Sequence, residues 1–245
     1  MDNTKLIALI TGVSREEGIG FGLARKMSEL GFEVIITARN KLKSERLAKK
    51  ISSDSNKVTA EEVDICNDES VNSLAHFMSL KFGRLDVLVN NAGGVLDYGI
   101  RALDTDFNTT REAFETNLFG AWRMIKALYP LLKKGKRPRI VNVSSGAGSF
   151  THELFGLPHH PAILTSYGLS KLALNGLTVK LAKELLQDNI LINSINPGLV
   201  ATSPGMEKMG ARSVSDSVAG IIWAATLPED GPTGKFFEDK QQLTW

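Results

Sequence analysis

One spacing that could do chemistry, a tyrosine four residues ahead of a lysine, occurs twice in this sequence. Tyr167 precedes Lys171 in the segment SYGLSK, and Tyr129 precedes Lys133. Four residues make about one helical turn, so in a helix each lysine lies beside its tyrosine. A free phenol keeps its proton to a pH of about 10, and a free amine to slightly above that. The spacing alone is weak support for a site, and the surroundings of each pair must distinguish them.

A glycine-rich stretch after the first predicted strand is the second candidate. It reads TGVSREEGIGFG, from Thr11 to Gly22, and leads into a segment of helical period. Glycines let the backbone turn sharply and approach a pyrophosphate, which the amides at a helix N-terminus can bind. The strict G-x-G-x-x-G spacing is absent, so a plain tight connection is the competing interpretation. The position after the first strand of a βαβ unit favours a dinucleotide.

The end of the second predicted strand indicates which dinucleotide is bound. That strand ends in TARN, so Arg39 stands where an acid would bind the ribose 2′-hydroxyl of NAD. A guanidinium suits the 2′-phosphate of NADP, and Arg15 in the glycine stretch could reach the same phosphate. Glu16 and Glu17 would repel that phosphate if they faced it. We predict that NADP(H) is preferred, with NAD(H) as the alternative.

The elements that must position these residues follow an alternating pattern of short apolar runs and longer helical segments. This pattern predicts an α/β, doubly wound (Rossmann), mostly parallel sheet with helices on both faces. Predicted strands cover 5–11, 33–38, 57–65, 85–90, 139–145 and 190–196. Predicted helices cover 19–30, 41–53, 68–82, 111–134, 167–188 and 213–226. No linker interrupts them, so residues 1–245 are expected to form a single dinucleotide-binding and catalytic domain.

The predicted helix 167–188 is apolar on two sides. Its rows are Leu174, Leu177, Leu181 and Leu185 on one side and Leu172, Val179 and Leu186 on the other. One partner is the sheet, and the second is a neighbouring helix or another subunit. We expect a homodimer or homotetramer through the 111–134 and 167–188 helices, with a monomer as the open alternative.

Composition excludes several classes of partner. With 245 residues, 42% of them hydrophobic and 23% charged, the chain has ordinary globular composition. A net charge of +2 without a long basic block gives no reason to expect nucleic acid. Cys66 is the only cysteine, which excludes an internal disulfide and a cysteine-built zinc site and favours a reducing compartment.

The N-terminal apolar run and the histidines complete this picture. The run before Thr11 is only five residues long, too short for a signal sequence or a membrane span. We therefore expect a cytoplasmic protein with no membrane partner. His159 and His160 are adjacent in a proline-flanked stretch, so we interpret them as loop residues and expect no metal.

Taken in order, these features resemble the short-chain dehydrogenase/reductase family, in its compact, carbonyl-reductase-like form. The glycine stretch is similar to the family's T-G-x-x-x-G-x-G, although five residues rather than three separate Gly12 from Gly18. The further matches, in family order, are Asp64, NNAG at 90–93, Asn117, Ser145, Tyr167 with Lys171, and NPG at 196–198 followed by Thr202. Each match is weak alone, but the ordered set spans residues 11 to 202.

The resemblance implies a catalytic set around Tyr167. Tyr167 would give a proton to the carbonyl oxygen as hydride arrives from the nicotinamide, and would accept it back in oxidation. Lys171 would hold the ribose hydroxyls and, with the oxidised nicotinamide, lower the pKa of Tyr167 toward neutrality. Ser145 would bind the substrate oxygen, and Asn117 would hold a water linking Lys171 to solvent. Tyr129, which is followed by a proline in the earlier helix, is interpreted as structural.

The resemblance also implies a set of cofactor contacts. They are Gly12, Ser14, Arg15, Gly18, Ile19, Gly20, Arg39, Asp64, Ile65, Asn91, Ala92, Gly93, Tyr167, Lys171, Pro197, Gly198, Val200 and Thr202. Within this site Asp64 would contact adenine, Asn90 would shape the adenosine pocket and Thr202 would bind the carboxamide. Capping or turn roles are the alternatives for these three.

The stretch between the serine and the tyrosine departs from the family. Tyr167 follows Ser145 by 22 positions, because 167 − 145 = 22, and compact members usually have fewer. The apolar side chains of this extra stretch, 149–165, would line the substrate pocket or pack on one another as a surface loop; they are Phe150, Leu154, Phe155 and Leu157. Residues 203–211 are short for a lid, which implies an open site and broad substrate tolerance.

The predicted function is an NADPH-dependent reductase that also runs as an alcohol dehydrogenase on a small carbonyl or alcohol substrate. One alternative is an NADP(H)-sensing or scaffold protein of the same fold, which would not need Ser145, Tyr167, Lys171 and Asn117 together. A second, a sugar-nucleotide epimerase or dehydratase, needs a substrate domain, and the chain after Thr202 is too short to supply one.

Overall fold

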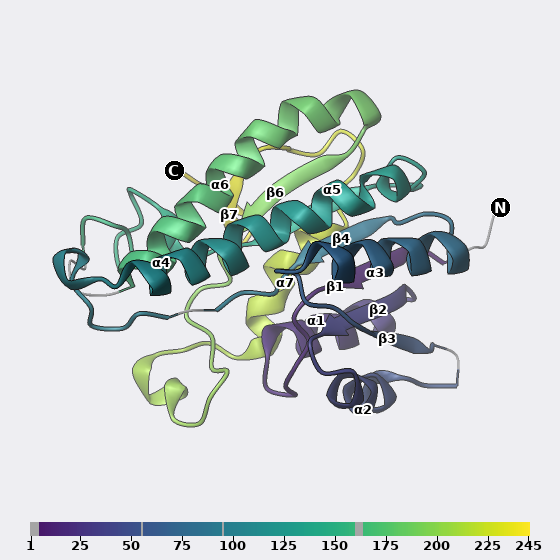
Figure 1. The fold of residues 1–245 in the computed structure, drawn as a ribbon, viewed down its shortest axis with the longest axis horizontal. Coiled ribbons are helices and arrows are strands. Elements are labelled where there is room, and N and C mark those ends of the chain that lie inside the picture. Colours follow the sequence, from purple (N-terminus) through teal and green to yellow (C-terminus); the bar gives the residue numbers. More distant parts are fainter. Residues whose placement is uncertain (1–4, 55, 95, 160–163) are drawn as a thin grey trace.

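A twisted sheet lies at the centre of the protein (Figure 1). The computed structural model describes residues 5–54, 56–94, 96–159 and 164–245, and within them the sheet has eight strands in the order β3-β2-β1-β4-β5-β6-β7-β8. Strands β1 to β7 are parallel, and β8 pairs antiparallel with β7. Their bounds are β1 Ile7–Ile10, β2 Glu33–Ala38, β3 Val58–Glu62, β4 Val87–Asn90, β5 Arg139–Val143, β6 Leu191–Ile195, β7 Phe236–Glu238 and β8 Gln241–Leu243.

Helices cover both faces of this sheet (Figure 1). Their bounds are α1 Ile19–Glu29, α2 Lys41–Ile51, α3 Asp68–Lys81, α4 Phe107–Phe114, α5 Gly120–Leu132, α6 Thr165–Leu185 and α7 Val214–Ala225. One buried layer joins the sheet to α1, α2 and α7, and the other joins it to α3, α5 and α6. The predicted doubly wound α/β fold is confirmed. None of the described helices has both the length and the apolar character needed to cross a membrane.

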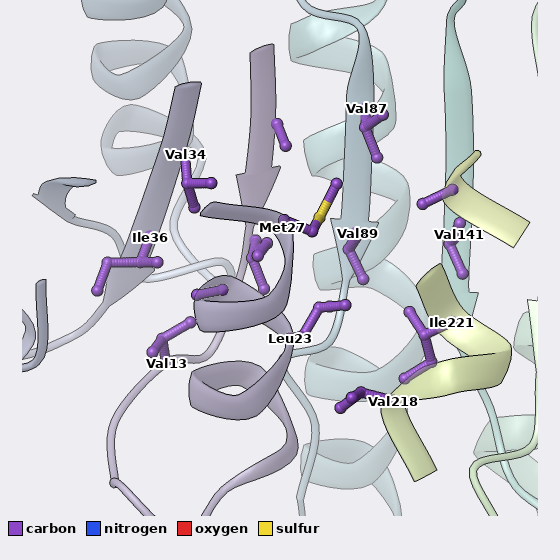
Figure 2. Packing of buried hydrophobic residues seen from close by; sticks show 14 of the residues in the cluster. Val13, Leu23, Met27, Val34, Ile36, Val87, Val89, Val141, Val218 and Ile221 are labelled. Carbon is purple, nitrogen blue, oxygen red and sulfur yellow. The ribbon is translucent and has the colours of Figure 1, made fainter. Parts of the chain in front are cut away.

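Successive side chains along a strand point to opposite faces of the sheet, so each strand contributes to both buried layers. In β1, Ala8 and Ile10 pack toward α1 and α7, whereas Ile7 and Leu9 pack toward α3, α5 and α6. Figure 2 shows the first layer, where Met27 of α1 and side chains of α7 lie against the strands. Because parallel strands under helices are buried on both sides, each reads as a continuous apolar run. This explains why six strands could be located in the sequence.

The long helix predicted over 111–134 is wrong at its start and in its regularity. It begins at Phe107, because the Asp106 carboxylate accepts the N–H of Thr109 at 3.0 Å and caps it. Between α4 and α5 the residues Glu115–Phe119 form a single π-helical turn. Runs of Thr and Asn at the helix start have low helix propensity, which the cap and the packing outweigh.

Two further differences concern the end of the chain and the two-sided helix. The short strands β7 and β8 were not predicted, since three residues carry too little pattern. Helix α6 extends from Thr165 to Leu185 and buries Leu174, Leu177 and Leu185, as one row predicts. In the opposite row Val179 is 46% exposed and Leu186 52% exposed, so the described residues do not fully cover that face.

Candidate active site

The predicted site residues meet at the carboxyl ends of the central strands. The glycine stretch follows β1, the NNAG segment follows β4, Ser145 follows β5 and the NPG segment follows β6. Strands β1, β4, β5 and β6 are neighbours and parallel, so these four connections lie along one edge of the sheet. In open α/β sheets this edge is where ligands bind.

Ser145, Tyr167 and Lys171 form a compact group. The hydroxyl of Ser145 is hydrogen-bonded to the hydroxyl of Tyr167. The Nζ atom of Lys171 lies 5.7 Å from the centre of the Tyr167 ring and donates a hydrogen bond of 2.8 Å to the carbonyl of Val143. Helix α6 therefore presents the tyrosine and the lysine on one face, toward the end of β5. The hydroxyl of the neighbouring Ser144 is buried and has no hydrogen-bond partner among the described residues.

Asn117 is held in the π-helical turn. Its Oδ1 accepts the N–H of Gly94 at 3.0 Å, and its Nδ2 donates to the Gly94 carbonyl at 3.0 Å and to the Ser170 hydroxyl at 2.9 Å. A Cβ at Gly93 would lie 3.0 Å from Asn117 Oδ1 and 3.3 Å from Lys171 Nζ. The π turn thus places a buried amide between the NNAG segment and α6. Such turns occur often at functional sites.

The pKa values of the central pair are set by burial. Desolvation raises the pKa of Tyr167 to about 12, against a smaller lowering by the Ser145 hydrogen bond and a smaller increase from Tyr98. Desolvation also lowers the pKa of Lys171 to about 8. Near neutrality this leaves the phenol protonated, as a proton donor must be. The predicted lowering of the Tyr167 pKa by Lys171 together with the oxidised nicotinamide concerns the cofactor-bound protein and stays a prediction.

The glycine stretch forms a cradle that side chains would fill. Gly12 has a φ of +75°, and a Cβ there would lie 2.5 Å from the Cα of Ala92. A Cβ at Gly20 would lie 2.7 Å from Asn91 Nδ2. The Thr11 hydroxyl accepts the N–H of Asn91 at 3.1 Å and that of Ala92 at 3.0 Å, so the two segments are locked together. This close approach of backbone fits a dinucleotide.

The start of α1 suits a pyrophosphate. Gly18 is the N-cap of α1 and offers no side chain to its free amides. The aliphatic part of Arg15 lies beside Gly18, where a Cβ would be 3.1 Å from Arg15 Cγ. Glu16 is ion-paired with Lys50 of α2, which neutralises one of the acids next to Arg15. Uncapped amides with a nearby guanidinium are good phosphate donors.

A cavity of about 410 Å³ lies beside this cradle, at the ends of β2 and β3. It is lined by Arg39, Asp64, Cys66, Arg111, Glu112, Glu115 and Thr116. The Asp64 carboxylate accepts the N–H of Cys66 at 3.0 Å, so part of its role is to order this turn. Arg39 and Arg111 bring positive charge to the cavity, next to the carboxylates of Asp64, Glu112 and Glu115. The glycine cradle fits a pyrophosphate, and the two guanidinium groups fit a phosphate on the adenosine.

The remaining predicted contacts divide into loop and interior positions. Gly198 has a φ of +73° and lies under Arg212, where a Cβ would be 2.9 Å from Nε. Val200 forms an isolated bridge with the same arginine, and the N–H of Thr202 bonds the Val200 carbonyl at 2.8 Å. Pro197 lies in this loop, as predicted. Ile65 instead packs against Gly120 of α5, where a Cβ would be 2.6 Å from its Cδ1.

Asn90 belongs to a buried polar row within the sheet, and its part in shaping the adenosine pocket stays a prediction. Its Nδ2 donates to Asn142 Oδ1 at 2.8 Å, and Asn142 in turn donates to the Thr178 hydroxyl at 2.9 Å. This buried polar row runs from β4 under α6 because Asn90 and Asn142 are register partners in the sheet. Asn91, the residue after Asn90, faces the glycine cradle instead, and its Nδ2 donates to the Thr11 carbonyl at 2.8 Å.

The extra stretch after Ser145 is braced by the end of the chain. Thr151 and Thr244 share a hydroxyl hydrogen bond of 2.6 Å, and His152 Nε2 lies 3.2 Å from Glu238 Oε2. A Cβ at Gly168 would lie 3.3 Å from Leu157 Cδ2, so Leu157 packs against the first turn of α6 at Gly168. Of the other proposed pocket residues, Phe155 lies against the His152 ring, and Phe150 and Leu154 are exposed. His160 lies outside the described residues.

Sequence reasoning missed several residues that shape the site. Ser170 connects Asn117 to α6, Arg212 covers Gly198, and Asp97 contacts the start of α6. Ser170 stands inside the SYGLSK segment and was within reach of motif reasoning. Arg212 and Asp97 act across long sequence distances, and no spacing identifies them.

The second tyrosine–lysine pair lies elsewhere. Lys133 Nζ is 4.8 Å from the centre of the Tyr129 ring, and the Tyr129 hydroxyl donates to Asp188 at 2.5 Å. These contacts join the end of α5 to the end of α6. They have no part in the strand-end site.

Comparisons with known proteins agree with this arrangement. The sequence profile described as short chain dehydrogenase matches residues 6–212. (+)-Neomenthol dehydrogenase of Arabidopsis thaliana is 30% identical, with 98% of each chain covered. Carbonyl reductase (NADPH) 1 of Mus musculus is 29% identical, with 100% of each covered. The solved structure of ElxO with NADP bound is 28% identical with a TM-score of 0.83, and 96% of this chain and 97% of ElxO are covered.

The chain therefore belongs to the short-chain dehydrogenase/reductase family. It is an NAD(P)-dependent oxidoreductase that acts between a carbonyl and an alcohol, and NADP(H) is its preferred cofactor. The predicted family, fold class, enzyme class and cofactor are thus confirmed.

Proposed function

We propose that the protein reduces apolar ketones and aldehydes, with Tyr167 as the proton donor. The observation that supports this most is the grouping of the Ser145 hydroxyl, the Tyr167 hydroxyl and the Lys171 amine at the strand ends that also form the glycine cradle. A protein that only senses the cofactor has no use for such a group. NADPH, when bound, supplies the hydride.

Each side chain then has a separate task. Ser145 and Tyr167 hold the carbonyl oxygen of the substrate between two hydroxyl groups, which stabilises the charge that develops there. Tyr167 gives its proton to that oxygen, and in the reverse direction takes it back. Lys171 keeps a positive charge near the phenol and binds the ribose hydroxyls. Asn117 fixes the NNAG segment and α6 relative to one another and supports the water that supplies protons.

Apolar side chains around the site support an apolar substrate. Tyr98 follows β4, Phe150 and Leu154 follow Ser145, and Met209 follows the NPG loop, and all four are exposed. Three separate segments that follow the strand-end site residues along the chain thus carry exposed apolar side chains. The alcohol named by the plant relative, neomenthol, is of the same apolar kind.

The test is NADPH oxidation over a panel of aldehydes, ketones and quinones. Wild type should turn over several apolar members, and Tyr167→Phe should bind NADPH normally but lose on the order of 100-fold or more of the rate, as expected for losing a general acid. Tyr129→Phe is the control, because it removes a hydroxyl of the same type from a structural pair, and it should keep the rate. Binding of NADPH without any turnover by wild type would favour the sensor alternative.

We also propose that two copies associate through the exposed faces of α5 and α6, and that the protein works in the cytoplasm. Val179 on α6, Leu186 just after it, Phe119 at the end of the π-helical turn and Trp122 on α5 are apolar and partly exposed. Light scattering should give a mass above that of one chain, and Val179→Asp should reduce it. A monomeric mass would contradict the association.

The free Cys66 suits a reducing compartment, which supports the cytoplasmic proposal. Recovery of the protein in a membrane or secreted fraction would contradict it.

A further inference from the structure

The first turn of α6, which carries Tyr167, receives no side-chain cap from Leu164, the described residue just before it. The residue before the helix, Leu164, has a left-handed backbone with a φ of 60°, and its side chain makes no capping hydrogen bond. The first N–H groups of a helix need acceptors, which a Ser, Thr, Asp or Asn just before the helix usually supplies. Helix ends fray without them. The proposed proton donor thus lies in a helical turn whose first N–H groups need acceptors from elsewhere in the fold.

Asp97, in the loop after β4, supplies the missing cap. One oxygen of its carboxylate accepts the N–H of Ser166 at 2.6 Å, and the other accepts the N–H of Tyr167 at 3.2 Å. Asp97 is only 7% exposed. Hydrogen bonds from amides to a buried carboxylate are stronger than neutral ones, and the negative charge lies at the positive end of the helix dipole.

Neighbouring contacts hold the same turn but leave the Tyr167 amide to Asp97. The Thr165 hydroxyl donates to the Ile100 carbonyl at 3.2 Å, and the Ser166 hydroxyl pairs with that of Thr110 at 2.9 Å. The Ser170 hydroxyl donates to the Tyr167 carbonyl at 2.7 Å. The backbone of Tyr167 is therefore fixed at its carbonyl by Ser170 and at its N–H by Asp97.

We infer that Asp97 is a positioning residue for the reaction. By fixing the backbone of Tyr167 it holds the phenol against Ser145, and it anchors the segment that carries Tyr98 beside the site. A displacement of about 1 Å in a reacting group can cost on the order of 100-fold in rate. The inference rests on the proposed role of Tyr167 as the proton donor.

A purely structural cap is the competing explanation, and the other end of α6 offers a matched control. There Asp188, in the short 3₁₀ turn that directly follows α6, accepts the Tyr129 hydroxyl at 2.5 Å and ties this end of the helix to α5. Asp188→Ala removes this carboxylate anchor without touching the strand-end site. If Asp97 only stabilises α6, the two alanine variants should behave alike.

The experiment compares Asp97→Ala, Asp97→Asn and Asp188→Ala with wild type. Asp97→Ala should lower kcat by about 10- to 100-fold while the Kd for NADPH stays within about twofold. Its solvent deuterium isotope effect on kcat/KM should rise, because proton transfer from a displaced phenol becomes more rate-limiting. Amide hydrogen exchange at residues 165–168 should be faster than in wild type. Asp97→Asn keeps one acceptor oxygen, so its kcat, isotope effect and exchange rate should lie between those of wild type and Asp97→Ala. If Asp97→Ala does not fold, Asp97→Asn takes its place in the comparison.

Asp188→Ala should lose thermal stability and keep both kcat and the isotope effect. An equal loss of kcat in that variant, or an unchanged isotope effect in Asp97→Ala or Asp97→Asn, would overturn the positioning role. If amide hydrogen exchange at residues 165–168 is unchanged in the Asp97 variants, Asp97 does not cap α6. If wild type turns over no carbonyl compound, the proposed function fails, and amide hydrogen exchange still shows whether Asp97 caps the helix.

Discussion

At the scale of single residues, the site places two ionisable groups where burial works against both of their charges. Lys171 is the clearer case, because its ammonium is buried and its only protein acceptor among the described residues is the Val143 carbonyl. Its pKa falls from 10.5 to about 8. A charge kept in such a place costs stability, and the chain tolerates that cost where function needs the charge.

This has a consequence for stability that can be measured on the protein alone. Below pH 8 Lys171 is charged in both the folded and the unfolded chain, and its burial lowers the free energy of unfolding by about 3 kcal/mol. Between pH 8 and 10.5 the unfolded chain binds more protons, so this penalty shrinks as the pH rises. Lys171→Met should therefore raise the free energy of unfolding at pH 7, by up to about 3 kcal/mol less the lost hydrogen bond, and gain little at pH 10.5.

Urea unfolding at the two pH values checks this, with reductase activity measured in parallel and expected to be mostly lost. Lys133→Met is the control, because Lys133 is exposed and belongs to the structural pair. It should change stability by no more than about 0.5 kcal/mol. A Lys171→Met protein that is less stable than wild type at pH 7 would show that burial of the charged lysine does not lower the free energy of unfolding.

Cofactor choice also belongs to this scale, and it turns on Arg39. Arg39 lines the cavity beside the glycine cradle together with Arg111. Arg39→Asp should lower the ratio of kcat/KM with NADPH to that with NADH by about 10- to 100-fold, since a hydrogen bond to a charged group contributes about 1.5 to 3 kcal/mol. Arg25→Asp, on the exposed side of α1, makes the same change in net charge and should leave the ratio alone. An unchanged ratio in Arg39→Asp would show that Arg39 does not select between NADPH and NADH.

Much of this residue-level chemistry could be predicted because local sequence order carries it. Tyr167 and Lys171 share one helix, and Ser145 directly follows a strand, so their meeting follows from strand order. Asp97 could not be predicted, because its contact with Tyr167 spans 70 positions and depends on a loop conformation. The pKa of Tyr167 could not be predicted either, because the effect of burial on it depends on how the surrounding side chains pack.

At the scale of elements, the glycine cradle is defined by how closely two backbones approach. Gly12→Ala would place a Cβ 2.5 Å from the Cα of Ala92, at a φ of +75°. It should lower the free energy of unfolding by clearly more than the roughly 1 to 2 kcal/mol of a left-handed alanine, and should weaken NADPH binding. Gly31→Ala is matched, because Gly31 has a φ of +86° but nothing within 4 Å of its Cβ position. Equal losses in the two variants would show that backbone strain, and not the collision, sets the effect.

Elements with a strong repeating pattern could be placed from the sequence, and those defined by few residues could not. Six strands and the helices on both faces follow from apolar runs and helical period. The π-helical turn at 115–119 leaves no trace in the period, although it is what brings Asn117 to Gly94 and Ser170. The start of α4 at Phe107 depends on the Asp106 cap among residues of low helix propensity.

At the scale of the whole molecule, three segments far apart in the sequence meet beside the site. His152 in the stretch after Ser145 and Arg212 at the end of the loop after β6 both contact Glu238 of β7, at 3.2 Å and 3.6 Å. Arg212 also lies over Gly198 and pairs with Asp239. The unpredicted C-terminal hairpin thus holds together the two loops that border the substrate side. Short terminal strands could not be recognised in the sequence, so this role emerged only from the fold.

Removal of this shared acid tests whether the hairpin supports the site. Glu238→Ala removes the partner of His152 Nε2 and one of the two acids that pair with Arg212, and should lower the free energy of unfolding by about 1 to 2 kcal/mol. Because both loops then lose a common anchor, KM for the carbonyl substrate should rise several-fold while the Kd for NADPH is retained. Glu184→Ala, which removes an exposed ion pair with Lys180 on α6, is the control and should change stability by less than about 0.5 kcal/mol. Chemical denaturation and steady-state kinetics measure both, and a Glu238→Ala enzyme with wild-type KM would mean that the two loops hold their shape without the hairpin.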